Sequence, residues 1–245
     1  MATLSPGTIF QGTAPVVQAD SFQGDALGMM QSPEIPKILK VEDDEKKRYG
    51  NTGFGDACLL ARNILAAERG TRFVAVNHGF WDFHTNIYDK TQKSNQYTLS
   101  RDLDTGLSEL ITDMEKTKTA DGRTLFEKTL IVCLGEFGRT PGDLTVGKGR
   151  DHHRFAMSAL FSGAGVIGGR ALGVTDEQGG TVVKPGWAKK RSMYPEDVAA
   201  TMYSALGIDW TKEITNTPSG RAFEYIEFQS GTNFLDVSEI DALFS

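Results

Sequence analysis

All four histidines of the 245-residue chain lie near carboxylates, in two short clusters. The first cluster covers residues 77–84 and has the sequence NHGFWDFH. The second covers residues 149–153 and has the sequence GRDHH. Imidazoles and carboxylates are common ligands of zinc and other divalent cations in proteins. The two clusters therefore predict a divalent metal site, with zinc as the first choice of ion.

The spacing of these residues limits which of them can bind one ion. Asp82 and His84 are two residues apart, so on an extended segment their side chains point to the same side. Asp151, His152 and His153 are adjacent and cannot all face one ion without a turn. We expect one or two of these three to coordinate the metal and the others to orient the ligands. The candidate metal ligands are thus Asp82, His84, Asp151, His152 and His153.

Glu136 and Arg139 are the candidate catalytic residues. Glu136 follows a short apolar run, residues 130–134, that Gly135 ends. Three roles are open for its carboxylate: metal ligand, general base, or ion-pair partner of Arg139. The guanidinium of Arg139, beside Thr140, suits an anionic group such as phosphate or sulfate.

One apolar run directly precedes the first cluster, and another precedes Glu136 and the Gly-rich connection that leads to the second cluster; these runs predict strands at 72–77 and 129–134. A third strand is expected at 157–161, and helices are expected at 57–67, 99–114 and 195–206. Helices that alternate with apolar strands predict an α/β fold with a largely parallel sheet flanked by helices. Ligands of such sheets bind beyond the carboxyl ends of the strands, where both clusters would lie.

Composition bounds the organisation of the chain and its partners. Residues 1–24 are rich in Gly, Thr, Ser and Gln and predict a loosely ordered leader, followed by one α/β domain over residues 25–245. The net charge of -6 argues against nucleic-acid and membrane-surface partners. No apolar run reaches the roughly 18 residues of a membrane-spanning helix. The first residues lack the pattern of a signal peptide, so the chain as given is expected in the cytoplasm. Cys58 and Cys133 predict two buried thiols.

Two other kinds of enzyme lack the motifs that their chemistry needs. Residues 142–148, GDLTVGK, have the spacing of a phosphate-binding loop, but Gly149 follows where a Ser or Thr is needed. A serine hydrolase lacks its G-x-S-x-G motif, and only Ser158 and Ser162 lie near the paired histidines.

Several blocks resemble the bacterial domain-of-unknown-function 1501 proteins over about residues 22–215, notably TLIVCLGEFGRTP and GRDHHRFAMSALFSG. That family belongs to the alkaline phosphatase/sulfatase-like superfamily. The resemblance implies an α/β/α sandwich and hydrolysis of phosphate or sulfate esters, with a small-molecule or polymer-linked anionic ester as substrate. It matches Asp82 and His84 to the family's W-D-x-H pair and Glu136 to the acid that ends a core strand. His152 or His153 would supply the remaining imidazole.

The chain also departs from that pattern. Phe83 and Arg154 replace the usual Thr and Pro, and Glu136-Phe137 stands where superfamily enzymes have Asp-His. Full-length relatives have a large N-terminal portion, often with an export signal, that contributes the first core strand and, in active enzymes, the nucleophile. We expect this chain to begin after that portion, with the sandwich incomplete at its N-terminus. Two functions follow: a metal-dependent ester hydrolase, or an inactive scaffold that keeps the fold and binds a partner. Oligomerisation is left open.

Overall fold

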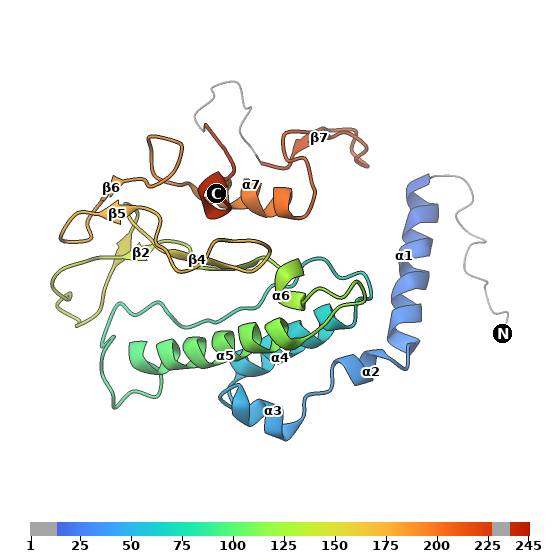
Figure 1. The fold of residues 1–245 in the computed structure, drawn as a ribbon, viewed down its shortest axis with the longest axis horizontal. Coiled ribbons are helices and arrows are strands. Elements are labelled where there is room, and N and C mark those ends of the chain that lie inside the picture. The colour runs from blue at the N-terminus through green and yellow to red at the C-terminus, as the bar shows by residue number, and fades with distance from the viewer. Residues whose placement is uncertain (1–13, 227–235) are drawn as a thin grey trace.

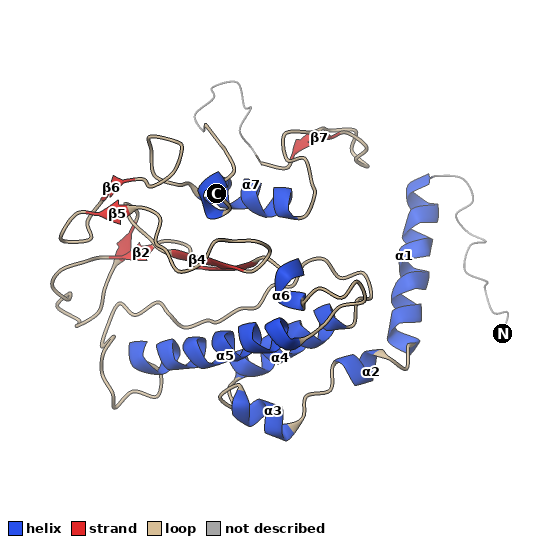
Figure 2. Cartoon of the chain, in the orientation of Figure 1, coloured by secondary structure: helices blue, strands red, loops and turns tan. Residues whose placement is uncertain are grey.

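The structure is a computed structural model that describes residues 14–226 and 236–245 (Figure 1). Figure 2 shows that helices and loops dominate and that the strands are short. The described helices are α1 (Ala14–Gln31), α2 (Ile35–Ile38), α3 (Asp43–Arg48), α4 (Gly53–Ala66), α5 (Gln96–Lys116), α6 (Leu125–Lys128), α7 (Pro195–Ala205) and the 3-10 turn η1 (Asp241–Leu243). The described strands are β1 (Ile131–Leu134), β2 (Gly138–Arg139), β3 (His152–His153), β4 (Ala159–Ser162), β5 (Val174–Thr175), β6 (Val182–Lys184), β7 (Glu213–Ile214) and β8 (Phe223–Glu224).

Helices α4 and α5 form the main helical layer, and α3 packs against α4. The side chains of Thr52 and Asn95 cap their first turns by accepting backbone N–H bonds. The apolar stripe of each helix meets in one core that includes Tyr49, Leu59 and Met114, all almost fully buried. Removing this apolar area from water is what holds the layer together.

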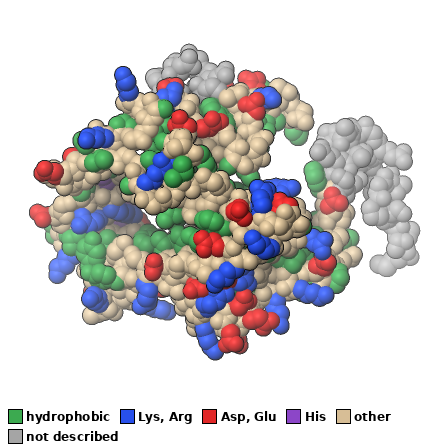
Figure 3. Space-filling view, in the orientation of Figure 1, with side chains coloured by type: hydrophobic (Ala, Val, Ile, Leu, Met, Phe, Trp, Pro, Cys, Tyr) green, Lys and Arg blue, Asp and Glu red, His purple; other side chains and the backbone are tan. Residues whose placement is uncertain are grey.

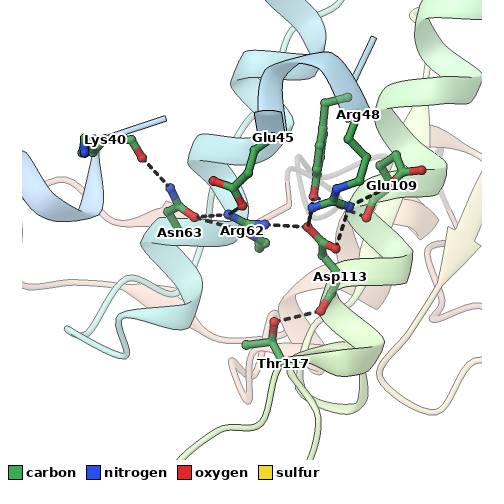
Figure 4. A network of polar contacts seen from close by, with 9 residues as sticks. Lys40, Glu45, Arg48, Arg62, Asn63, Glu109, Asp113 and Thr117 are labelled. Carbon is green, nitrogen blue, oxygen red and sulfur yellow. Dashed lines mark hydrogen bonds and ion pairs between the residues drawn. The ribbon is translucent and has the colours of Figure 1, made fainter. Parts of the chain in front are cut away.

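A polar network joins α3, α4 and α5 at Asp113 (Figure 4). Arg48 donates to both carboxylate oxygens of Asp113, at 2.8 and 2.7 Å. Arg62 and the Tyr49 hydroxyl also donate to this carboxylate, at 2.5 and 2.9 Å. Burial raises the pKa of Asp113, but these hydrogen bonds outweigh it and lower the pKa to about 2. Asp113 is therefore a carboxylate whose charge is held by the fold.

Strands β1 to β4 form two antiparallel pairs, and along the chain the inner pair lies between the two strands of the outer pair. The outer pair is β1 with β4, in the register Cys133 with Leu160. The inner pair is β2 with β3, in the register Arg139 with His152. One face of the outer pair contacts the helical core, because Ile131 packs against it. The inner pair and the loop between its strands thus extend from a base that the core holds in place.

The predicted largely parallel sheet flanked by helices, as in an alkaline phosphatase-like sandwich, is wrong for the part of the chain that the structure describes. The described strands form four two-stranded sheets, and each pair is antiparallel. Residues 72–77, predicted to be a strand, belong to none of these sheets. Parallel neighbours need a crossover segment, usually a helix, between them. The chain between β1 and β4 instead turns back through β2 and β3, so β4 returns in the opposite direction.

The C-terminal part has its own small core around α7. Ala200, Trp210 and Ile226 are buried together there. Asp197, which is fully buried, is paired with Arg191 through both of its oxygens, at 2.6 and 2.9 Å. Its carboxylate also accepts from the backbone N–H groups of Tyr194 and Ser238. This carboxylate is saturated by structural contacts.

Helix α1 lies to the side of the helical layer in Figure 1. It includes residues 14–24 of the predicted leader, whereas residues 1–13 lie outside the described residues. The side chains of residues 22–31 are exposed. No described helix combines the length and the apolar character needed to cross a membrane. Figure 3 shows acidic and basic side chains interspersed on the visible face, without a patch of one sign.

Candidate metal centre

The β2–β3 pair and the loop at its tip form the base of the candidate site. The backbone N–H of Thr140 donates to the carbonyl of Asp151 at 2.9 Å, and the N–H of Asp151 donates to the Thr140 hydroxyl at 3.0 Å. The guanidinium of Arg150 donates to the carbonyl of Thr140 at 2.6 Å and to that of Gly142 at 3.1 Å. These bonds fix the direction in which residues 151 and 152 leave the loop.

A second segment, residues 82–87, is joined to the β2–β3 loop by backbone hydrogen bonds. The N–H of Arg150 donates to the carbonyl of Phe83 at 2.9 Å. The N–H groups of Asn86 and Ile87 donate to the carbonyls of Gly147 and Lys148, at 2.9 and 3.0 Å. The two histidine clusters, far apart in the sequence, are therefore held side by side by main-chain hydrogen bonds.

Gly149 allows this close approach. A Cβ at this position would overlap the backbone carbonyl of His84 and the amide of Thr85. Only a residue without a side chain fits where two backbones come this close. Nearby, Phe80 and Lys148 adopt positive φ angles of 71° and 59°, which are uncommon for residues other than glycine. The chain path around the site is thus sterically constrained.

Three potential ligand atoms converge at the meeting point of the two clusters. Asp82 Oδ1 lies 3.1 Å from His84 Nε2 and 3.2 Å from His152 Nε2. The two Nε2 atoms are 3.2 Å apart. A zinc ion bonded at about 2.0–2.1 Å to tetrahedral ligands holds those ligands roughly 3.3–3.4 Å apart. The three atoms form a nearly equilateral triangle close to that size, and it matches one face of a zinc tetrahedron.

Two further residues hold the triangle from outside. Asp151 Oδ1 lies 2.8 Å from His84 Nδ1, so the carboxylate holds the proton on that nitrogen and leaves the Nε2 lone pair facing the triangle. Arg139 donates from one nitrogen to Asp82 Oδ1 and from another to the carbonyl of Arg150, the latter at 3.1 Å. The hydrogen bonds from Arg139 and then from His152 lower the pKa of Asp82. The Asp82 carboxylate is therefore kept ionised, as a metal ligand must be.

The structure separates the remaining predicted residues from this triangle. His153 turns to the other side of β3, where its Nε2 lies 2.8 Å from the carbonyl oxygen of Gly180. Glu136 is exposed and forms no hydrogen bond or ion pair with any described residue. The alternative of a Glu136–Arg139 ion pair is not realised, because Arg139 pairs with Asp82 instead. The predicted pair between neighbouring residues is thus replaced by a pair between Arg139 and the first histidine cluster.

His78 and Trp81, from the first cluster, serve packing. The His78 ring stacks on Phe54 at a centroid distance of 4.4 Å and meets Trp81 edge-on at 5.2 Å. Burial lowers the pKa of His78 and favours its neutral form. The thiols predicted to be buried differ: Cys58 is buried in the core, which raises its pKa to about 12, and Cys133 is half-buried.

Sequence reasoning missed two residues that shape the site. Gly149 begins the second cluster and mismatches a phosphate-binding loop, but its close contact with His84 has no local sequence signal. Phe137 was noted only as a departure from a family pattern, yet its ring lies against His152 at a centroid distance of 4.1 Å. The alternation of Phe137 and Arg139 around Gly138 is a period-two signal that could have placed both side chains on one side of a strand.

The triangle is open to solvent. The side chains of Asp82, His84 and His152 are 64%, 43% and 51% exposed. The three ligand atoms are therefore accessible from solvent.

Comparison with known proteins gives the chain a family and no structural template. No solved structure matches it. The sequence matches a family described as "Protein of unknown function (DUF1501)" over residues 9–236. This match covers most of the chain and includes both histidine clusters. The chain therefore belongs to the DUF1501 family.

Proposed function

We propose that this protein binds a divalent metal ion, zinc in first place, through Asp82, His84 and His152. The observation that carries the proposal is the triangle of Asp82 Oδ1 and the two Nε2 atoms, with sides of 3.1, 3.2 and 3.2 Å. Two imidazoles and one carboxylate with a free fourth position are the ligand set of many catalytic zinc sites. A structural zinc site would instead be closed by a fourth protein ligand.

We further propose that the bound metal serves the hydrolysis of phosphate or sulfate esters, the chemistry of the alkaline phosphatase/sulfatase-like superfamily. The support for this superfamily is the motif resemblance alone. Zinc in such a site polarises an ester oxygen or lowers the pKa of a water molecule. Arg139, beside Asp82, is suited to hold an anionic oxygen of the substrate. Glu136 is exposed and contacts none of the three ligand residues, so its role as a general base stays a prediction from the sequence.

The metal proposal is tested by zinc stoichiometry after loading and desalting, measured by elemental analysis. We expect about one zinc per chain in the wild type, and its loss in His84→Ala and in His152→Ala. His153→Ala is the matched control, because His153 adjoins His152 but faces Gly180. Wild-type stoichiometry in both His84→Ala and His152→Ala would refute the site.

A second function, metal binding without catalysis, is supported by the exposure of the three ligand side chains. Enzymes usually exclude water from the reacting groups. Here the three ligand side chains are 43–64% exposed, so water is not excluded from them. A panel of aryl phosphates and sulfates separates the two functions. Zinc-dependent turnover that His84→Ala abolishes supports the hydrolase, whereas stoichiometric zinc without turnover supports the binding protein.

A further inference from the structure

The two histidines of the triangle are held in different ways. His84 is fixed through its second ring nitrogen, since Nδ1 lies 2.8 Å from Asp151 Oδ1. The polar contacts of His152, with Asp82 and His84, both use Nε2, and its Nδ1 bonds no described residue. Metal-binding histidines are normally oriented through the nitrogen that does not bind the metal. Some other contact must therefore set the ring plane of His152.

The ring of Phe137 makes that contact. Its centroid lies 4.1 Å from that of His152, with 35° between the ring planes. The strand register explains the approach, because Arg139 is directly opposite His152 in the β2–β3 pair. Phe137 precedes Arg139 by two residues, so its side chain points to the same side of the pair.

Phe137 is itself held by the site. The guanidinium carbon of Arg139 lies 5.7 Å from the centroid of the Phe137 ring, which is within the range of a cation–π contact. The same guanidinium is anchored to Asp82 and to the carbonyl of Arg150. The His152 ring thus contacts two rings, that of Phe137 and that of His84, whose centroid is 4.9 Å away. These two contacts limit its freedom to rotate.

We propose that Phe137 is the positioning residue of His152. Its ring fixes the imidazole plane so that Nε2 faces Asp82 and His84. Asp151 has the same role for His84, which it orients through a hydrogen bond. Phe137 takes no part in the chemistry itself. The consequence for metal binding rests on the function proposed above, but the effect on the imidazole does not.

The first test uses the metal-free protein and the NMR signals of the His152 imidazole. Phe137→Leu keeps an apolar side chain and removes the aromatic ring, whereas Phe137→Tyr keeps the ring. We expect Phe137→Leu to weaken the nuclear Overhauser effects between the His152 and His84 rings, because the imidazole plane is no longer fixed, and Phe137→Tyr to keep them. Unchanged nuclear Overhauser effects between these two rings in Phe137→Leu would overturn the proposal, whether or not the protein binds zinc.

The second test is zinc affinity, measured by competition with a chromophoric chelator. Loss of an orienting group around a metal ligand typically weakens binding roughly 10- to 100-fold, and we expect this for Phe137→Leu. Phe155→Leu is the matched control, because the Phe155 ring contacts His153 instead, at 5.7 Å. Equal affinities of Phe137→Leu and Phe155→Leu would contradict the proposal, as would a Phe137→Tyr variant as weak as Phe137→Leu. If the wild type binds no zinc, the metal proposal fails, and the NMR test still decides the role of Phe137.

Discussion

Asp113 and Asp82 are both carboxylates that accept hydrogen bonds from arginine, yet they belong to different kinds of region. The Asp113 side chain is 10% exposed and is surrounded by two guanidinium groups and a hydroxyl. The Asp82 side chain is 64% exposed, and two imidazole nitrogens share its environment. Guanidinium groups have no lone pair to offer a metal, whereas neutral imidazoles do. The chemistry of the partners and their access to solvent, rather than the number of contacts, separate a structural carboxylate from a candidate ligand.

The charged segment of α3 repeats this contrast within a few residues. Lys47 and Asp44 form an exposed ion pair, with side chains 74% and 96% exposed. Arg48 instead turns inward to Asp113 and Glu109. Exposed pairs contribute about 0–1 kcal/mol, while breaking a buried pair costs about 3–5 kcal/mol because the other charge is left unpaired. Ion pairs of similar residue types thus contribute very different free energies of folding when exposed and when buried.

Asp113→Ala gives the largest expected effect and tests whether the Asp113 network serves stability. We expect the free energy of unfolding to fall by about 3–5 kcal/mol, because Arg48 and Arg62 lose their shared carboxylate. Asp104→Ala, at an exposed position of the same helix, is expected to change it by less than about 0.5 kcal/mol. Urea unfolding followed by circular dichroism measures both. Equal losses in the two variants would show that the network contributes no more than an exposed charge.

Gly149→Ala tests the other side of the comparison, the backbone contact that brings the two histidine clusters together. The added methyl group would overlap the carbonyl of His84, so the two loops must separate. We expect zinc affinity to fall by at least about 100-fold, which is about 2.8 kcal/mol. Gly135→Ala is the control, since the nearest atom to its Cβ would be the Phe137 carbonyl oxygen at 3.8 Å, an ordinary contact. Zinc binding at wild-type strength in Gly149→Ala would mean that the loops adapt.

The smallest of the three effects is the acid sensitivity that Asp113 confers. Its pKa is lowered from 3.8 to about 2, so on acidification the unfolded state takes up the proton first. Stability from this group is present above pH about 4, declines as the pH falls toward 2, and totals about 2 kcal/mol. We expect urea unfolding of the wild type to lose more stability over this range than Asp113→Asn does. Parallel pH profiles of the two proteins would contradict the lowered pKa.

The sequence predicted helices α4, α5 and α7 well, whereas it predicted no helix at α1 (Ala14–Gln31). The helices expected at 57–67, 99–114 and 195–206 are observed as α4, α5 and α7, each extended or shortened by a few residues. Their apolar stripes and first-turn residues are local features, which decide helix formation over a few turns. Strands expected at 129–134 and 157–161 are also present, as β1 and β4. In all these cases the information lies within the segment itself.

The direction and partners of the strands were predicted wrongly. An apolar run rich in β-branched residues indicates an extended, buried segment, but it does not say which neighbour it pairs with. Residues 72–77 have such a pattern and pair with no described strand, although Val76 packs on the helical core. The antiparallel pairing of β1 with β4 depends on the return of the chain through β2 and β3. The path that brings β4 back beside β1 depends on all of residues 131–162 and not on any one segment.

By itself the sequence determined which side chains could bind a metal and placed them in two clusters, because residue type and local spacing are written in it. The tertiary structure decided which of them meet. It selected His152 over its neighbour His153, because adjacent residues of a strand point to opposite sides and Asp82 and His84 lie on the side of His152. It assigned Arg139 to Asp82 rather than to Glu136, because backbone hydrogen bonds bring residues 82–87 beside the β2–β3 loop. Distances between residues so far apart in the chain depend on the path of the backbone, which no local pattern encodes.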